Sequence, residues 1–327
     1  MAEETIAETA DYAAFKARVK QKTGIDLNLY KQQQMHRRLL SLLEKVQVKS
    51  FVDYFAVLER DPNEWKVFLD RMTINVSELF RNPEKWEELR RPILTEWLAR
   101  GTPGSATRPF KVWSAGCSYG AEPYSLAILL DQIASGMRHT LHATDLDRTI
   151  LAKAREGHFT QSDIKNVPPA VLERYFTRIK AGTTERVGAA EGTLRSDSRR
   201  ETVAASGRTE RATAATATAV PAYLRADVER TVASLEPAYQ VRDEIRARIT
   251  FSQQNLLADR FDEGYDLICC RNVVIYFTDD AKADLYRRFH KALRPGGVLF
   301  VGGTERIFES RALGFEMPLP FFYRKTE

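Results

Sequence analysis

Two glycines and a glutamate follow a strand-like segment at residues 110–115 and lie in a turn that could bind a ligand. The segment WSAGCSYGAEPYSLAILL, residues 113–130, passes through Gly116 and Gly120 into an apolar helical run that begins near Glu122. In an open parallel sheet, a strand–helix turn of this kind binds nucleotide-like ligands, because glycines let the backbone approach closely. The pattern is not GxGxxG, however, and glycines at such a turn also occur for structural reasons alone.

A second candidate is Asp145, which ends the next strand-like segment in HATDLD, residues 142–147. At the carboxyl end of a neighbouring strand, a carboxylate can bind both ribose hydroxyls of an adenosine. The alternative role is that of an N-cap for the following helix, but Asp147 is better placed for it. Because no GxxxxGK[ST] phosphate-binding motif is present, the two signals favour adenosine without a triphosphate, as in S-adenosylmethionine.

A third group of polar residues follows the apolar run DLICC, residues 266–270. Arg271 and Asn272 come directly after it, and Tyr276 follows shortly. Placed at the same carboxyl edge of a sheet, these residues would face the same ligand. A buried arginine requires a partner, so Arg271 is difficult to explain by packing, whereas Tyr276 and Phe277 could simply be core residues.

These candidates need a sheet whose strands alternate with helices. Strand patterns occupy residues 110–115, 140–144, 249–252, 265–270 and 298–302, and helical patterns occupy 123–133, 148–155 and 279–293. This alternation predicts an α/β fold with a mainly parallel, doubly wound sheet, in which a last strand at 321–324 is antiparallel.

The first hundred residues are predicted to be helical throughout. Apolar periodicity predicts helices over residues 11–23, 29–46, 51–58 and 63–72. A further helix is predicted to begin at Pro83, with Asn82 as its N-cap, and to run to Trp97. Pro92 should bend it. The turn-rich segment 101–109 predicts a boundary between domains 1–101 and 102–327. Residues 181–220 contain no aromatic residue and are predicted to be a flexible insertion, with a helix near 223–235 leading back to the core.

Composition excludes several classes of protein. Hydrophobic residues make up 43% and charged residues 28% of the 327 residues, as in ordinary soluble proteins, and no apolar run is long enough to span a membrane. The acidic N-terminus lacks the features of a secretory signal, so we expect a cytoplasmic protein. Three cysteines without a CxxC pair and five histidines without HExxH spacing argue against disulfides and metal sites. The net charge of +5 favours an acidic partner.

Six ordered segments resemble the chemotaxis receptor glutamate O-methyltransferases, the CheR family. They are INVSELFRNPEKW (74–86), WSAGCSYGAEPYSLA (113–127), ATDLD (143–147), QNLL (254–257), CRNVVIYF (270–277) and LRPGGVLFVGGTE (293–305). The resemblance implies an N-terminal all-α receptor-recognition domain and a Rossmann-like S-adenosylmethionine-dependent methyltransferase domain. It also implies methyl transfer to glutamate side chains of methyl-accepting chemotaxis receptors, with S-adenosylhomocysteine as product.

The resemblance assigns cofactor contacts residue by residue. These fall on Asn75, Ser77, Arg81, Glu122, Asp145, Asn255, Leu256, Arg271 and Asn272, of which Asn255 and Leu256 would flank the adenine. The chain departs from the family in two places. Ser77 replaces a threonine, and SYGAEP replaces STGEEP, so that Tyr119 and Ala121 replace a hydroxyl-bearing and an acidic residue. Because Glu122 is kept, we expect cofactor binding to be kept as well.

The implied reaction needs few catalytic groups. A glutamate carboxylate is ionised at pH 7 and a sulfonium methyl is already activated, so no general base is required and alignment should dominate. We expect Arg81 or Tyr276 to orient the carboxylate. Tyr276 is preferred, because an arginine gripping both carboxylate oxygens would stabilise the ground state.

The implied partner is a glutamate-rich receptor helix, for which the basic residues Lys31, Arg37, Arg38 and Lys45 are suited, although a merely solvated helix face is the alternative. We expect a monomer that neither binds nucleic acid nor inserts into membranes. Two rival functions stay open: a methyltransferase acting on RNA, for which no aromatic and basic stacking patch is found, and a cofactor-binding regulator without transfer. Base-labile methyl esters on receptor, label in RNA, or binding without transfer would separate the three.

Overall fold

The computed structural model describes residues 9–73, 75, 77–94, 109–133, 138–179 and 238–326. The predicted insertion at 181–220, the helix near 223–235 and nearly all of the predicted boundary at 101–109 lie outside these ranges. Among the helices described, none combines the length and the apolar character needed to cross a bilayer.

The N-terminal region is all helical, as predicted. Its elements are α1 (Ala10–Thr23), the 3-10 helix η1 (Leu27–Leu29), α2 (Gln32–Lys45), α3 (Phe51–Arg60) and α4 (Pro62–Thr73). Helix α1 ends where Gly24 takes a left-handed conformation with φ of 74°, which glycine adopts without strain. Helix α2 begins later than the predicted residue 29, because Tyr30 instead forms an isolated antiparallel bridge with Phe277.

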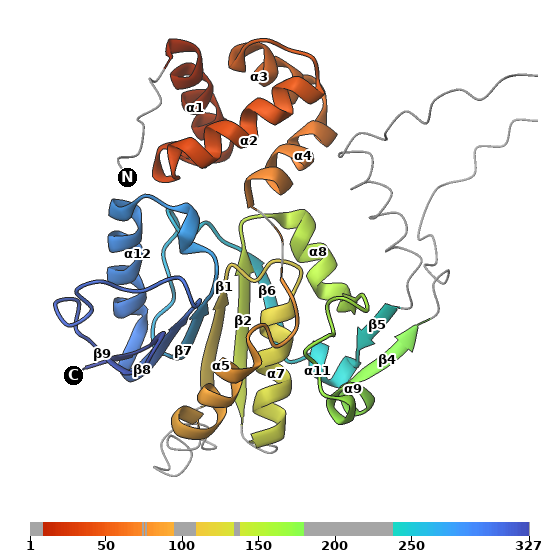
Figure 1. The fold of residues 1–327 in the computed structure, drawn as a ribbon, viewed down its shortest axis with the longest axis vertical. Coiled ribbons are helices and arrows are strands. Elements are labelled where there is room, and N and C mark those ends of the chain that lie inside the picture. The colour runs from red at the N-terminus through yellow and green to blue at the C-terminus, as the bar shows by residue number, and fades with distance from the viewer. Residues whose placement is uncertain are drawn as a thin grey trace, which may run out of the picture. The chain divides into compact units, whose positions relative to one another are not determined.

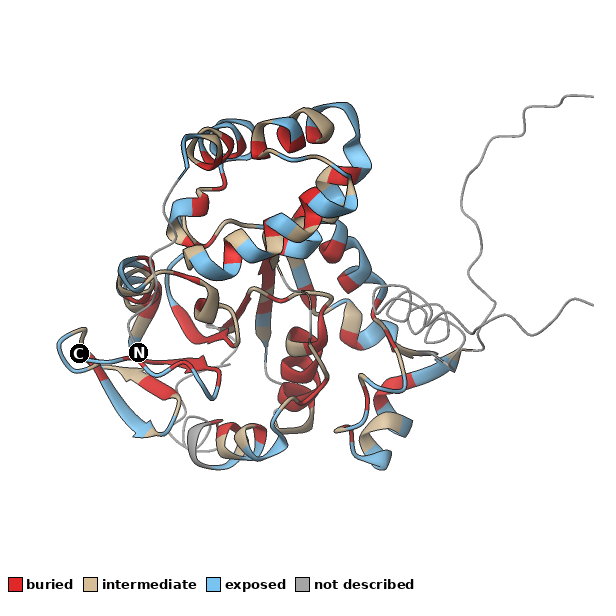
Figure 2. Cartoon of the chain, turned by 45° about the horizontal axis from the view of Figure 1, so that its top comes forward, coloured by how far each residue is buried: buried red, intermediate tan, exposed pale blue. Residues whose placement is uncertain are grey.

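Aromatic side chains form the centre of this helical region. Phe15 is fully buried and lies 5.6–6.3 Å, between ring centroids, from Phe51, Tyr54, Phe55 and Phe68. Along α1 to α4, buried positions recur between exposed ones (Figure 2), as expected for helices that pack one face against their neighbours. The apolar spacing that predicted these helices therefore also forms their shared core.

The central sheet has seven strands in the order β6-β2-β1-β7-β8-β10-β9 (Figure 1). The parallel strands are β1 (Phe110–Ala115), β2 (His139–Asp145), β6 (Ile249–Gln253), β7 (Tyr265–Cys270) and β8 (Leu293–Val301). Strands β10 (Phe322–Lys325) and β9 (Phe315–Leu319) complete one edge in antiparallel orientation. The predicted mainly parallel sheet with an antiparallel last strand is confirmed, while β9 was missed.

Helices cover both faces of the sheet, and alternate strand residues pack on each. Trp113 and Ile268 pack in one cluster with residues of α12 (Asp279–Ala292). Val112 and Leu267 pack in the other with residues of α7 (Ala121–Ile133) and α8 (Arg148–Glu156). Strands buried on both faces produce continuous apolar runs such as DLICC.

A smaller sheet was not predicted. It contains β3 (His158–Phe159), β5 (Ala238–Val241) and β4 (Phe176–Ile179) in that order. The short helices α9 (Pro169–Tyr175) and α11 (Asp243–Arg246) flank β4 and β5 in the chain. Strands of two to four residues carry too few alternating positions for a recognisable pattern.

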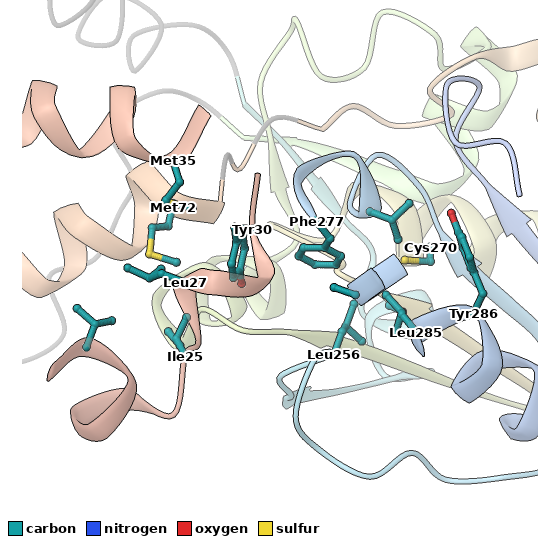
Figure 3. Close-up of a cluster of buried hydrophobic side chains, with 14 of the residues drawn as sticks. Ile25, Leu27, Tyr30, Met35, Met72, Leu256, Cys270, Phe277, Leu285 and Tyr286 are labelled. Atoms are coloured by element: carbon teal, nitrogen blue, oxygen red, sulfur yellow. The ribbon is translucent and has the colours of Figure 1, made fainter. Parts of the chain in front are cut away.

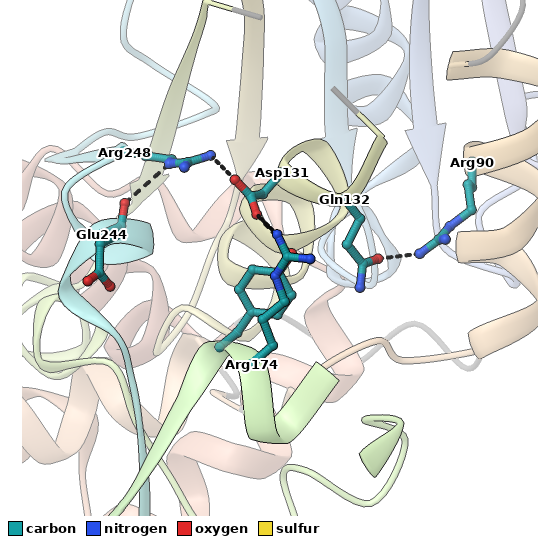
Figure 4. A network of polar contacts seen from close by, with 7 residues as sticks. Arg90, Asp131, Gln132, Arg174, Glu244 and Arg248 are labelled. Atoms are coloured by element: carbon teal, nitrogen blue, oxygen red, sulfur yellow. Dashed lines mark hydrogen bonds and ion pairs between the residues drawn. The ribbon is translucent and has the colours of Figure 1, made fainter. Parts of the chain in front are cut away.

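A network centred on Asp131 attaches these short elements to α7 (Figure 4). Its carboxylate accepts a hydrogen bond from the Tyr175 hydroxyl at 2.8 Å and pairs with Arg248 at 2.8 Å and Arg174 at 3.5 Å. Burial alone would raise the pKa of Asp131, but these donors lower it below its usual value. The network thus joins α7 to α9 and to the segment between α11 and β6.

Two local predictions were wrong in instructive ways. Helix α5 (Pro83–Glu88) starts at Pro83 as predicted, but the Asn82 side chain does not cap it, because Asn82 is left-handed with φ of 60°. Its Oδ1 instead accepts a hydrogen bond from Arg271. The helix then continues as the π-helix η2 (Leu89–Leu94), which contains Pro92. Trp97 and Gly101 lie outside the described residues.

Strand β8 also begins earlier than predicted and includes Pro295, Gly296 and Gly297. A Cβ at Gly297 would lie 2.9 Å from the carbonyl oxygens of Arg294 and Tyr265. The glycine thus permits close backbone approach where the register of β7 and β8 shifts.

Candidate functional site

One pocket gathers the predicted site residues. Its lining includes all nine positions assigned to the cofactor, Asn75, Ser77, Arg81, Glu122, Asp145, Asn255, Leu256, Arg271 and Asn272, and also Tyr276. These residues come from the helical region, from the ends of β1, β2 and β7, and from the loop after β6. The structure therefore brings them together, while the role of each stays a prediction.

The turn after β1 depends on Gly116. This residue has φ of 82°, and a Cβ there would lie 2.6 Å from Val273 Cγ2. Its amide donates to Thr144 O at 2.8 Å, which fixes the turn against the end of β2. A side chain at this position would be strained and would collide with the loop after β7.

Asp145 lies at the end of β2 beside this turn. It is 8% exposed, and its Oδ2 and Oδ1 accept hydrogen bonds from the amides of Ser118 (2.8 Å) and Asp147 (3.1 Å). Burial raises the pKa of Asp145 despite these donors. Asp147 is the N-cap of α8, where its Oδ1 accepts from Thr149 N at 2.7 Å. The N-cap role therefore belongs to Asp147, and the ribose contact of Asp145 stays a prediction.

Glu122 lies in the first turn of α7, and its Oε1 accepts a hydrogen bond from Ser114 Oγ at 2.7 Å. Burial raises the pKa of Glu122 to about 7, against the opposing effects of the Arg271 charge and the Ser114 hydrogen bond. The carboxylate thus changes charge near neutral pH.

This shifted pKa predicts pH-dependent cofactor binding. S-adenosylmethionine, the cofactor that the resemblance implies, carries a positive sulfonium, which the ionised form of Glu122 should favour. Protonation of Glu122 below about pH 7 should weaken S-adenosylmethionine binding. The affinity should fall by about tenfold from pH 8 to pH 6, because a carboxyl group is about nine-tenths protonated when the pH is one unit below its pKa. Titration calorimetry across this range should show proton release on binding at pH 6, and Glu122→Gln should remove the pH dependence. An unchanged profile in that variant would contradict the assignment.

Arg271 is buried beneath the pocket. Its Nη2 donates to Arg81 O at 2.8 Å and to Asn82 Oδ1 at 3.2 Å, and its guanidinium lies 4.6 Å from the ring centroid of Phe300. The partners of this buried cation are thus a carbonyl and an amide oxygen. Burial lowers the pKa of Arg271, against the opposing effect of the negative charge of Glu122.

Asn272, the next residue, is left-handed with φ of 61°. Glu305, a residue that sequence reasoning missed, fixes this turn, since its Oε2 accepts from the amides of Asn272 (2.6 Å) and Gly302 (2.7 Å). Glu305 is 3% exposed, and burial raises its pKa. Its only sequence signal was its place in the segment LRPGGVLFVGGTE.

Hydrogen bonds to the glycine turn hold the segment that carries Asn75 and Ser77. Ser118 Oγ donates to Asn75 Oδ1 at 3.2 Å. The Tyr119 hydroxyl contacts both Ser77 O and Asp163 Oδ1. The departure from the family at Tyr119 therefore supplies a hydroxyl that fastens this segment.

The loop after β6 contributes Leu256, which is 8% exposed and lines the pocket. The Asn255 side chain is partly used within the loop, because its Oδ1 accepts from Leu257 N at 3.0 Å. Arg288 of α12 donates to the carbonyl oxygens of Leu256 and Asp259. The apolar side chain of Leu256 is thus held against the pocket from outside.

Arg81 and Tyr276, the predicted orienting residues, both line the pocket. Arg81 lies in the bend before α5, and its guanidinium has no hydrogen-bond partner among the described residues. The Arg38 guanidinium lies 4.9 Å from the ring centroid of Tyr276 and donates to Met72 O at 3.2 Å.

The four basic residues predicted to contact the receptor, Lys31, Arg37, Arg38 and Lys45, therefore differ in exposure. Lys31 precedes α2 as its N-cap residue and is half-buried, as is Arg38, whereas Arg37 and Lys45 are exposed. Burial lowers the pKa of Arg38, and the neighbouring charges of Arg71 and Arg37 add to this effect. Arg37 and Lys45 can thus bind a partner without disturbing Tyr276, whereas Arg38 cannot.

Ser118 and Tyr30 are among the pocket residues that the sequence did not predict. Ser118 lies in the glycine turn and could have been found there. Tyr30 lies in the helical region and matches no motif, so nothing in the sequence connected it with the pocket.

Comparisons with known proteins agree with this geometry. The model of the CheR methyltransferase SAM-binding domain matches residues 75–191 and 204–318, and that of the CheR methyltransferase all-alpha domain matches residues 10–73. A chemotaxis protein methyltransferase of Listeria monocytogenes is 32% identical over 97% of each chain. One of Listeria innocua is 33% identical over 97% of each chain, and one of Escherichia coli is 29% identical over 93% of this chain and 87% of its own.

Proposed function

The chain belongs to the CheR methyltransferase family, and from this premise we propose that it methylates glutamate side chains of chemotaxis receptors. As an S-adenosylmethionine-dependent chemotaxis protein methyltransferase, it requires a cofactor pocket next to a site for an acceptor carboxylate. The observation that carries the proposal is the meeting of both in one place: the nine cofactor positions and Tyr276 line a single pocket, and Arg38 lies against Tyr276.

The residues present fit the cofactor. Asp145 offers a carboxylate at the end of β2, Leu256 offers an apolar surface, and Glu122 offers a second carboxylate for positive charge. When bound, S-adenosylmethionine supplies a methyl group activated by a positive sulfonium. The protein has to hold this group in line with an incoming carboxylate and exclude water around both.

A glutamate carboxylate can attack without losing a proton, because it is ionised at neutral pH. The new bond joins a carboxylate oxygen to the methyl carbon, the carbon–sulfur bond breaks, and its electron pair stays on sulfur. The products are a neutral methyl ester and the neutral thioether of S-adenosylhomocysteine, so the negative charge of the carboxylate and the positive charge of the sulfonium are both lost. No general acid or base is needed at any step.

Tyr276 and Arg81 are the proposed orienting groups. The Tyr276 hydroxyl can donate one hydrogen bond to the carboxylate and leave the attacking oxygen free. Arg38 packs on the Tyr276 ring and holds it in place. The guanidinium of Arg81, which has no hydrogen-bond partner in the described part of the chain, can attract the carboxylate into the pocket, provided that it does not bind both oxygens.

Labelled cofactor provides the direct test. The full chain is incubated with S-adenosylmethionine carrying a labelled methyl group and with receptor cytoplasmic fragments, and base-labile methyl release is counted. A fragment whose candidate glutamates are changed to alanine is the matched control. Label in added RNA, or cofactor binding with no transfer to receptor fragments, would reject the proposal in favour of a rival function.

Charge reversal on α2 gives a further prediction about the receptor surface. Changing exposed Arg37 and Lys45 to glutamate should lower receptor methylation severalfold at low salt and have little effect near 1 M salt, where the Debye length is about 3 Å. Cofactor affinity should be unchanged, because neither residue lines the pocket. The control variant reverses Lys153 and Lys291, two exposed lysines on α8 and α12, and changes net charge equally. Equal losses in both variants would contradict a role for α2.

A further inference from the structure

Tyr30 joins the helical region to the cofactor pocket. It lies between η1 and α2 and pairs with Phe277 through two main-chain hydrogen bonds, Lys31 N to Tyr276 O and Thr278 N to Leu29 O, each 2.9 Å long. Its ring meets that of Phe277 edge-on, with centroids 5.3 Å apart. Figure 3 shows Tyr30 between Met72 and Leu27 on one side and Phe277 on the other. The backbone and the ring are therefore both held in place.

The Tyr30 hydroxyl, in contrast, has no hydrogen-bond partner among the described residues. The residue is only 8% exposed and lines the pocket, yet no hydrogen bond joins its hydroxyl to any part of the chain that the structure describes. The hydroxyl oxygen is not fully buried, so a ligand in the pocket can reach it. Burial raises its pKa, and the negative charge of Asp145 raises it further. The hydroxyl therefore stays protonated at neutral pH, and a ligand in the pocket can accept its hydrogen bond.

Counting hydrogen-bond sites on Asp145 shows what that ligand group could be. A carboxylate has about four lone-pair sites, and the amides of Ser118 and Asp147 use one on each oxygen. One site on each oxygen is left, which matches the two hydroxyl donors of a ribose. Ribose hydroxyls that donate to Asp145 keep their own oxygen lone pairs, so each of these oxygens can still accept a hydrogen bond from another pocket residue, and Tyr30 lines the same pocket.

We propose that the Tyr30 hydroxyl donates a hydrogen bond to a ribose hydroxyl oxygen of the bound cofactor, so that the helical region supplies part of the cofactor site. This inference rests on the proposed function only in taking the ligand to be S-adenosylmethionine or its product. It also connects the cofactor with α2, because the main-chain pairing of Tyr30 directly precedes that helix.

The test compares wild-type protein with Tyr30→Phe in calorimetric titrations with S-adenosylhomocysteine. The variant should bind about fivefold more weakly, the effect of one neutral hydrogen bond, and its thermal unfolding without ligand should be unchanged because the hydroxyl has no protein partner. Repeating both titrations with the 2′-deoxy and 3′-deoxy analogues locates the contact. With one of the analogues, the variant and the wild type should bind within twofold of each other.

Tyr54→Phe is the matched control from the same helical region. The Tyr54 hydroxyl is buried and donates to Glu64 Oε1 at 2.9 Å, away from the pocket, so this variant should lose stability and keep its affinity. The inference is overturned if Tyr30→Phe binds S-adenosylhomocysteine as tightly as wild type does. It is also overturned if the variant binds both deoxy analogues about fivefold more weakly than wild type binds them. Absence of binding by wild-type protein would instead refute the cofactor assignment itself, and absence of methyl transfer with normal binding would refute only the proposed function.

Discussion

Replacing Asp145 with alanine should weaken binding of S-adenosylhomocysteine at least about a hundredfold and leave the chain folded. Two hydrogen bonds from ribose to a charged acceptor would be lost, and each is worth about 1.5–3 kcal/mol. The folded state should tolerate the change, because burial already disfavours the ionised carboxylate, as its raised pKa indicates. Titration calorimetry measures the affinity, and circular dichroism with thermal unfolding checks the fold.

Asp147→Ala is the matched control, two residues away in the same motif. Asp147 caps α8 through the amides of Thr149 and Ile150, so its loss should lower the free energy of unfolding by about 1 kcal/mol. Cofactor affinity should change little. A folded Asp145→Ala variant with wild-type affinity, or equal losses of affinity in both variants, would show that Asp145 does not bind the ribose.

Replacing Arg271 with methionine should lower the free energy of unfolding by about 2–6 kcal/mol, because two oxygen acceptors would lose their donor at a cost of about 1–3 kcal/mol each. Arg81 O and Asn82 Oδ1 would lose their donor, and the pKa of Glu122 would rise above about 7 without the nearby positive charge. Cofactor affinity at neutral pH should fall as well, because Glu122 would then be protonated. Urea unfolding and calorimetry measure the two effects.

Arg287→Met controls for the loss of a cation. Arg287 is exposed on α12 and lies 3.6 Å from Asp284, and an exposed pair of this kind contributes at most about 1 kcal/mol. If the Arg271 variant were no less stable than the Arg287 variant, the contacts of Arg271 with the segment before α5 would have to be unimportant for the fold.

Most of the fold was predictable from local sequence. Strand β1, helix α8 and strand β7 were predicted within one residue of their observed bounds, because apolar residues with period 2 or 3.6 determine which face of an element is buried. Short elements such as β3 carry no such signal. Strand β8 was misjudged at its start, because glycines that look like a turn in sequence instead allow close backbone approach.

The sequence by itself determined which residues could meet at one sheet edge, since Glu122, Asp145, Arg271 and Asn272 all follow strands whose parallel order forces their ends together. Tertiary structure alone decided their partners. Arg271 binds Arg81 O and Asn82 Oδ1, Arg38 packs on Tyr276, and Tyr30 reaches the pocket from the helical region. The physical reason is that periodicity reports burial of a face within one element, whereas a hydrogen-bond partner distant in sequence is selected only when two elements pack.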